Sequence, residues 1–107
     1  MEIIQYGIIL VELEAPGGAK MAHTRPCAVV SPNEMNRYLR TVVVAPMTTR
    51  ARTYPTRVRV RHNRQTGWIA VDQITTIDRS KVIRQLGKLA HPEIRKLKAV
   101  IRETYVD

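Results

Sequence analysis

An arginine and a threonine stand next to two apolar segments, and their side chains suit the chemistry of a phosphodiester. Arg25 comes directly before the apolar run Pro26–Val30, and Thr48 follows the run Val42–Ala45. A guanidinium grips two phosphate oxygens with its forked N–H groups, and a threonine hydroxyl can donate to the same phosphate. If the two runs form neighbouring strands, both side chains converge at one edge of a sheet. We therefore predict a phosphate-binding site around Arg25 and Thr48.

Such a pair could take part in cutting RNA without a metal ion. In that reaction the ribose 2′-hydroxyl attacks the adjacent phosphorus. The site must remove the hydroxyl proton, stabilise charge on the phosphate oxygens and protonate the leaving 5′-oxygen. Arg25 suits the stabilisation of charge, and Thr48 can contact the phosphate or orient the nucleophile. Both residue types are common, so a surface ion pair for Arg25 and a loop cap for Thr48 stay open as alternatives.

The chain is strongly basic, with 18 Lys and Arg residues against 9 Asp and Glu residues, a net charge of +9 and an isoelectric point near 10.5. This charge implies a polyanionic partner, which is a nucleic acid, an anionic membrane or an acidic protein. A membrane is the least favoured, because the amphipathic C-terminal segment has Tyr105 as its only aromatic anchor. The alternating segment Thr56–Arg61 carries Arg57, Arg59 and Arg61 on one face, where they could contact RNA or simply be solvated.

Length and composition predict one domain over residues 1–107 that acts in the cytoplasm. The single cysteine, Cys27, excludes an internal disulfide, fits a reducing cytosol and is expected to be a small buried hydrophobe. No Cys/His cluster has the spacing of a zinc site, so we expect neither a metal nor a cofactor. No apolar stretch approaches the roughly 18 residues of a membrane span, and we expect no secretory signal.

Apolar runs separated by turn residues predict an α+β domain dominated by antiparallel sheet. The expected strands are Gly7–Leu13, Pro26–Val30, Thr41–Ala45, Thr56–Arg61, Gly67–Val71, Ile74–Ile77 and Val82–Leu89. Two polar loops, Ala15–Thr24 and Met47–Pro55, flank the predicted site, and a turn is expected over Asn63–Thr66.

Two helices are expected beside the sheet. Ser31 as N-cap, Pro32 in the first position and Glu34 completing a capping box predict a short helix that ends near Tyr38. Pro92 begins the last helix. Helical spacing predicts that its apolar face consists of Ile94, Leu97, Val100, Ile101 and Thr104.

An ordered set of segments resembles the MazF/PemK family of toxin endoribonucleases. The segments are Thr24–Cys27, Val29–Pro32, Asn36–Arg37, Val43–Thr49, Tyr54–Pro55 and Val71–Asp78, and the resemblance extends from about Gly7 to the C-terminus. It implies an SH3-like small β-barrel with a short helix after the second strand, a C-terminal helix, and a homodimer. It implies metal-independent, sequence-specific cleavage of single-stranded RNA to 2′,3′-cyclic phosphate and 5′-hydroxyl ends, which inhibits translation and growth. It also implies a cognate antitoxin whose acidic, disordered tail covers the RNA groove.

The residues that match the catalytic pair of the family are Arg25 and Thr48. Residues expected to contact RNA around them are Lys20, His23, Thr49, Arg50, Arg52, Arg57, Arg59 and Arg61. Lys20 stands where the family often has a glutamate, so an acid–base role at that position does not carry over. His23 could shuttle a proton or be a bystander. The loops Glu14–Thr24 and Met47–Pro55 are expected to shape base recognition.

Two other functions stay open. A non-cleaving nucleic-acid-binding module needs only the positive charge. A CcdB-like gyrase poison would share the barrel, although the Trp-Gly-Ile type of C-terminus of that group is replaced here by Thr104–Asp107. Among the remaining residues, His62 and His91 are expected on the surface. Trp68 is expected in core or dimer packing rather than against an RNA base, and Asp72 in a turn.

Overall fold

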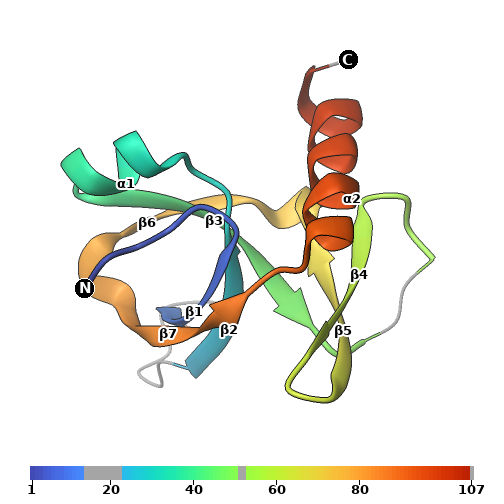
Figure 1. The fold of residues 1–107 in the computed structure, drawn as a ribbon, viewed down its shortest axis with the longest axis horizontal. Coiled ribbons are helices and arrows are strands. Elements are labelled where there is room, and N and C mark those ends of the chain that lie inside the picture. The colour runs from blue at the N-terminus through green and yellow to red at the C-terminus, as the bar shows by residue number, and fades with distance from the viewer. Residues whose placement is uncertain (14–22, 51–52, 107) are drawn as a thin grey trace.

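The computed structural model describes residues 1–13, 23–50 and 53–106, and consists of a curled antiparallel sheet with a helix at each side (Figure 1). The strands are β1 (Gly7–Leu13), β2 (His23–Val29), β3 (Thr41–Thr48), β4 (Arg57–His62), β5 (Gln65–Ala70), β6 (Thr75–Asp78) and β7 (Val82–Lys88). The helices are α1 (Asn33–Tyr38), α2 (His91–Ile101), the short turns η2 (Val71–Gln73) and η3 (Arg79–Lys81), and the π-helical η4 (Arg102–Val106). The prediction of an antiparallel α+β domain is confirmed.

Strand β3 is the centre of the sheet because it pairs with three other strands. Along one edge, residues 44–46 pair with β2, which continues through β1 to β7. Along the other edge, residues 41–44 pair with β6 and residues 47–48 pair with β5, whose hairpin partner is β4. Pro46, which has no N–H to donate, falls between the residues paired to β6 and those paired to β5. The sheet therefore bends along β3 and brings the β4–β5 hairpin toward β2.

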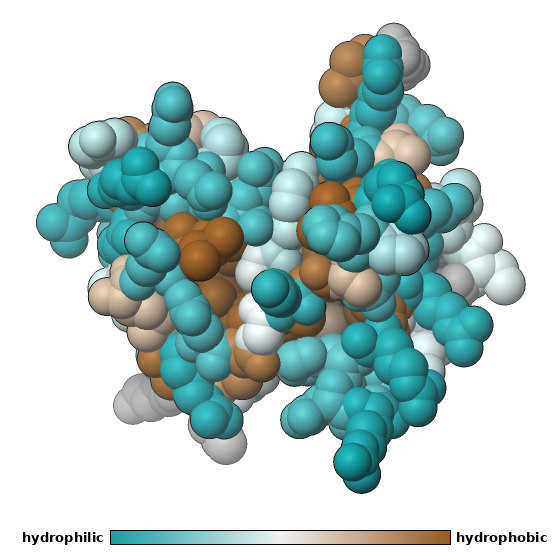
Figure 2. Space-filling view, in the orientation of Figure 1, coloured by the Kyte–Doolittle hydropathy of each residue, from teal (hydrophilic) through white to brown (hydrophobic). Residues whose placement is uncertain are grey.

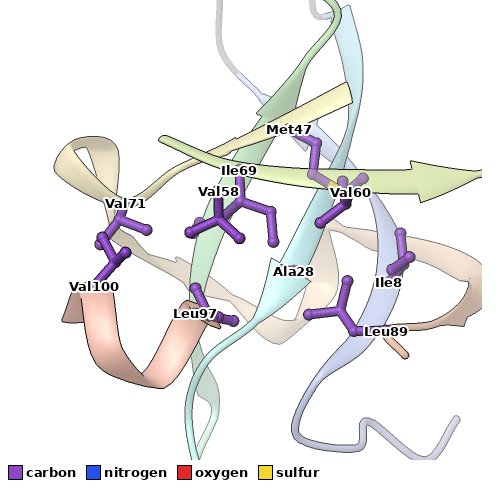
Figure 3. Close-up of a cluster of buried hydrophobic side chains, with 11 residues drawn as sticks. Ile8, Ala28, Met47, Val58, Val60, Ile69, Val71, Leu89, Leu97 and Val100 are labelled. Atoms are coloured by element: carbon purple, nitrogen blue, oxygen red, sulfur yellow. The ribbon is translucent and has the colours of Figure 1, made fainter. Parts of the chain in front are cut away.

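Hydrophobic side chains gather on both faces of β1, β2 and β3. Figure 2 shows the outer surface, where hydrophilic side chains cover α1, α2 and the β4–β5 hairpin, and hydrophobic ones show in the hollow between them. Inside, one cluster joins Ile8, Ala28 and Met47 to α2 (Figure 3), and the other contains Ile9 and Cys27. Neighbouring residues of a strand point to opposite faces, so the inner parts of these strands are apolar on both faces, and polar residues stand at their ends.

Helix α2 closes the first cluster with Leu97 and Val100, which are buried as predicted. Its start is tied to the sheet by Glu93, whose carboxylate accepts the backbone N–H of Ala90 at 2.8 Å and that of Arg61 on β4 at 2.8 Å. One carboxylate thus caps the helix and fixes it against the strand that leads to the site.

The predicted capping box at the first helix is wrong. Helix α1 begins at Asn33, and its N-cap residue Pro32 provides no side-chain hydrogen bond. Ser31 is buried instead: its hydroxyl bonds the Asn36 side chain and accepts the backbone N–H of Val43 on β3 at 3.1 Å. The hydroxyl therefore joins α1 to the sheet, a tertiary contact that sequence spacing does not reveal.

Three strand boundaries differ from the prediction by two residues or more. Strand β2 begins at His23 rather than Pro26. Strand β3 runs to Thr48 rather than Ala45, because Pro46 and Met47 remain buried in the sheet. The β4–β5 turn consists of Asn63 and Arg64 alone, which have φ angles of 55° and 63°, so β5 begins at residue 65 rather than 67. A two-residue turn of this handedness matches the twist of a hairpin and is shorter than the turn predicted.

Candidate functional site

A pocket of about 260 Å³ lies where β2 begins and β3 ends, and it contains both residues of the predicted pair. Its described lining is Arg25, Pro26, Met47, Thr48, Thr49, His62, Gln65, Thr66 and Gly67. These residues come from β2, from β3 and its following loop, and from the β4–β5 hairpin. The bend along β3 is what brings the hairpin to the other two strands.

The pairing of β2 with β3 explains why Arg25 and Thr48 meet. Cys27 stands opposite Pro46, and continuing this register by two residues sets Arg25 opposite Thr48. Both side chains then extend from the same face of the sheet, the face of Cys27. Both residues are half-buried, so their polar groups are held by the strands but remain reachable from solvent.

The hydroxyl of Thr48 is oriented by the chain that follows it. Its Oγ1 accepts the backbone N–H of Arg50 at 3.2 Å, which leaves the O–H free to donate. Strand β5 approaches closely at Gly67, where a Cβ would lie 3.2 Å from the Thr48 carbonyl oxygen. The absence of a side chain at Gly67 therefore lets the end of β3 pack closely against the hairpin. Thr49, the residue after Thr48, also lines the pocket.

The three arginines predicted on one solvated face separate into two kinds. Arg59 and Arg61 are exposed as predicted. Arg57 is not, since its side chain is only 9% exposed and its Nε lies 3.2 Å from Oδ1 of Asp72. Its guanidinium also stands 5.4 Å from the ring centre of Tyr54. Arg57 thus joins β4 to η2, a contact made between segments 15 residues apart.

His62 was predicted on the surface, but it is half-buried and lines the pocket. It is the last residue of β4 and stands opposite Gln65 on β5. Along β4 it has the same parity as Val58 and Val60, whose side chains are buried. That parity was the signal in the sequence: the alternation that turns the arginines outward turns His62 inward.

The other predicted RNA contacts lie around or beyond the pocket. Thr49 lines it, Arg50 follows as an exposed residue, and His23 is exposed at the start of β2 without lining it. Lys20 and Arg52 fall outside the residues that the structure describes.

Cys27 follows the pocket residue Pro26 in the chain, but its buried thiol is unreactive. It is fully buried, as predicted, and this burial raises the pKa of its thiol from 9.0 to about 12, although the Arg25 charge acts in the opposite direction. The group is therefore a thiol rather than a thiolate near neutral pH and does not act as a nucleophile.

Within residues 1–13, 23–50 and 53–106, no group of three or more His, Cys, Asp or Glu side chains could hold a metal ion. In the same part of the chain, no helix is long and apolar enough to cross a membrane.

Comparison with known proteins identifies the class to which this fold and site belong. Residues 4–105 match the model of the PemK-like, MazF-like toxins of type II toxin–antitoxin systems. The chain belongs to this family, which confirms the resemblance seen in the sequence. None of the curated protein sequences matches it significantly.

Solved structures share the fold at low sequence identity. The Mycobacterium tuberculosis toxin MazF-mt6 has a TM-score of 0.79 and 24% identity over 94% of this chain and 96% of that one. A mycobacterial endoribonuclease in complex with its cognate antitoxin has a TM-score of 0.80 and 24% identity, covering 94% and 92%. The MazE–MazF complex of Deinococcus radiodurans reaches 0.83 with 21% identity, covering 96% and 95%. The predicted barrel with its two helices is thereby confirmed.

Asp72→Asn should destabilise the fold by about 1–3 kcal/mol, because the largely buried Arg57 guanidinium loses its paired charge. Urea unfolding followed by circular dichroism measures the change. Arg59→Gln, on the same strand but exposed, is the control and should shift the free energy of unfolding by less than about 0.5 kcal/mol. Equal shifts in the two variants would show that the ion pair contributes no stability.

Proposed function

We propose that this chain is a toxin that cuts single-stranded RNA, messenger RNA above all, at short sequences and without a metal ion. The observation that carries the proposal is the shared pocket of Arg25 and Thr48 in a chain of net charge +9. Family membership and the similar fold of a mycobacterial endoribonuclease support it. Cutting messenger RNA in the cytoplasm would stop translation and growth.

In the proposed reaction the ribose 2′-oxygen attacks the adjacent phosphorus, and the bond from phosphorus to the 5′-oxygen breaks. The products are a 2′,3′-cyclic phosphate and a 5′-hydroxyl. Arg25 binds the non-bridging oxygens, where charge develops, through its forked N–H groups. Thr48 donates its free O–H to the phosphate or holds the 2′-oxygen in line, since its acceptor side is engaged with the N–H of Arg50.

The RNA on either side of the cut would follow exposed cations near the pocket. Arg50, Arg59 and Arg61 are exposed, whereas Arg57 is engaged with Asp72 and is left out of this surface. Phosphate contacts of this kind make binding salt-dependent, with a slope of roughly −0.7 in log K against log salt for each contact to a single strand.

Arg25→Ala and Thr48→Val should abolish most cutting while RNA binding largely survives. The assay incubates the protein with a long unstructured RNA in excess EDTA and maps the fragment ends. Losing one group that stabilises the transition state costs roughly 100- to 1,000-fold in rate. Arg95→Ala, on the exposed side of α2, removes the same charge away from the pocket and should cut normally.

RNA that is bound by the wild-type protein yet stays intact in this assay would contradict the proposal and favour a non-cleaving binding module. Gyrase-dependent DNA breaks in cells with intact RNA would favour a gyrase poison instead.

We further propose that a cognate antitoxin covers the RNA surface with an acidic, disordered tail. Antitoxin complexes among the structures of similar fold support this partner. A tail rich in Asp and Glu would compete with RNA phosphates for the same cations. A tail peptide should therefore displace a fluorescent RNA oligonucleotide, and the same peptide with Asn and Gln at the acidic positions should not. Simultaneous binding of tail and RNA at full affinity would refute the competition.

We propose, finally, that the toxin acts as a homodimer, and that the second copy covers an apolar groove between β1, β7 and the start of α2. The groove has a volume of about 850 Å³ and is lined by Ile4, which is 47% exposed. A hollow with hydrophobic side chains is visible on the face shown in Figure 2. A buried charge in such an interface is unfavourable.

Ile4→Glu should therefore halve the mass that light scattering measures at micromolar concentration. Met35→Glu, on α1 and 38% exposed, adds the same charge outside the groove and should leave the dimer intact. A wild-type mass equal to that of one chain would contradict the dimer.

A further inference from the structure

Among the described residues that line the pocket of Arg25 and Thr48, one is of a type that both takes up and releases a proton near neutral pH. RNA cleavage must move two protons, one off the 2′-hydroxyl and one onto the 5′-oxygen. An arginine does not release its proton in proteins, and hydroxyl and amide side chains do not titrate in this range. Of the described residues that line the pocket, His62 alone has a side chain whose ordinary titration range is near neutral pH.

The strands hold His62 in place. It ends β4 on the side of the buried residues Val58 and Val60, and the imidazole is half-buried. Strand β7 passes close to the ring at Gly87, where a Cβ would lie 3.2 Å from Cε1 and 3.6 Å from Nδ1 of His62. The missing side chain of Gly87 leaves room for the ring on the inner face of β4, so the pocket receives His62 from one face of the sheet and Arg25 and Thr48 from the other.

The named charges around His62 are mostly positive, so a bound phosphate is the anion that would favour a proton donor there. Its partner on β5, Gln65, is uncharged, and Arg25 is the charged residue of the described pocket lining. Arg64 lies in the turn after His62, Lys88 follows Gly87 on β7, and the Glu93 carboxylate on α2 accepts the N–H of Arg61, the residue before His62. A phosphate held at Arg25 brings negative charge into this cationic pocket, and an anion beside an imidazole stabilises its protonated form.

We propose that His62 is the general acid of this toxin. As the 2′-hydroxyl loses its proton to water and its oxygen forms a bond to phosphorus, the bond from phosphorus to the 5′-oxygen breaks, and the imidazolium gives its proton to that leaving oxygen. The imidazole is left neutral and regains its proton from solvent after the 5′-hydroxyl product departs. The proposal rests on the cleavage activity proposed above and adds a residue to it.

The test compares His62→Gln with Arg95→Gln, an exposed residue of α2 that lines neither the pocket nor the groove proposed for the dimer. Single-turnover cleavage is measured from pH 5 to 9 in EDTA. Wild-type protein and Arg95→Gln should lose rate as pH rises through the imidazole range, because the acid form is consumed. His62→Gln should be slower by roughly 100-fold or more and should lack that fall. Its RNA affinity and circular dichroism should match the wild type.

A substrate with sulfur in place of the 5′-oxygen at the cut site tests directly whether His62 is the proton donor to the leaving group. A thiolate leaves without needing a proton, so the rate of His62→Gln should return to within a few fold of the wild-type rate on this RNA. Arg25→Ala should stay slow, since its defect concerns charge on the non-bridging oxygens. This readout also separates a lost proton donor from a misfolded pocket, which the sulfur would not rescue.

Three results would overturn the proposal. A His62→Gln variant that cuts ordinary RNA with the wild-type rate and pH profile removes the proton-transfer role while leaving the proposed function intact. A slow variant that the sulfur substrate does not rescue assigns His62 to structure or binding. Wild-type protein that cuts neither RNA refutes the endoribonuclease activity itself, and the role of His62 with it.

Discussion

The pairing of strand β3 with three partners is the constraint on which the rest of the structure depends. One edge of β3 holds β2, and the other holds first β6 and then β5. The first pairing aligns Arg25 with Thr48, and the second brings His62 on the β4–β5 hairpin to the same pocket. Backbone hydrogen bonds thus assemble a site from segments that are far apart in sequence.

Burial on both faces of the central strands makes this arrangement rigid. Cys27 and Ala28 belong to different hydrophobic clusters although they are neighbours in the chain. A shift of register by one residue would exchange these faces, so the position of Arg25 relative to Thr48 is strongly specified. The same packing keeps the Cys27 thiol protonated. Not every arginine of this basic chain is available to a ligand. Arg57 pairs with Asp72 and thereby stabilises the fold.

Much of the fold could be predicted from local patterns, because each pattern reflects which side of an element is buried. Apolar runs located the strands, and helical spacing found Leu97 and Val100 of α2. The boundaries that failed involve tertiary contacts: the Ser31 hydroxyl bonds α1 and β3 instead of capping a helix. The pair Arg25 and Thr48 was found from residue chemistry and a family resemblance, and the structure places both in one pocket. Their catalytic role stays a prediction.

The sequence by itself determined the net charge, the spacing of apolar residues in the strands and in the last helix, and the family. These depend on residue types and on spacing within one segment. Only the tertiary structure decided which polar groups share the pocket, that Arg57 pairs with Asp72, and that the His62 ring lies beside Gly87. Such contacts depend on strand order and register, which result from the packing of the whole chain and leave no local trace in any one segment.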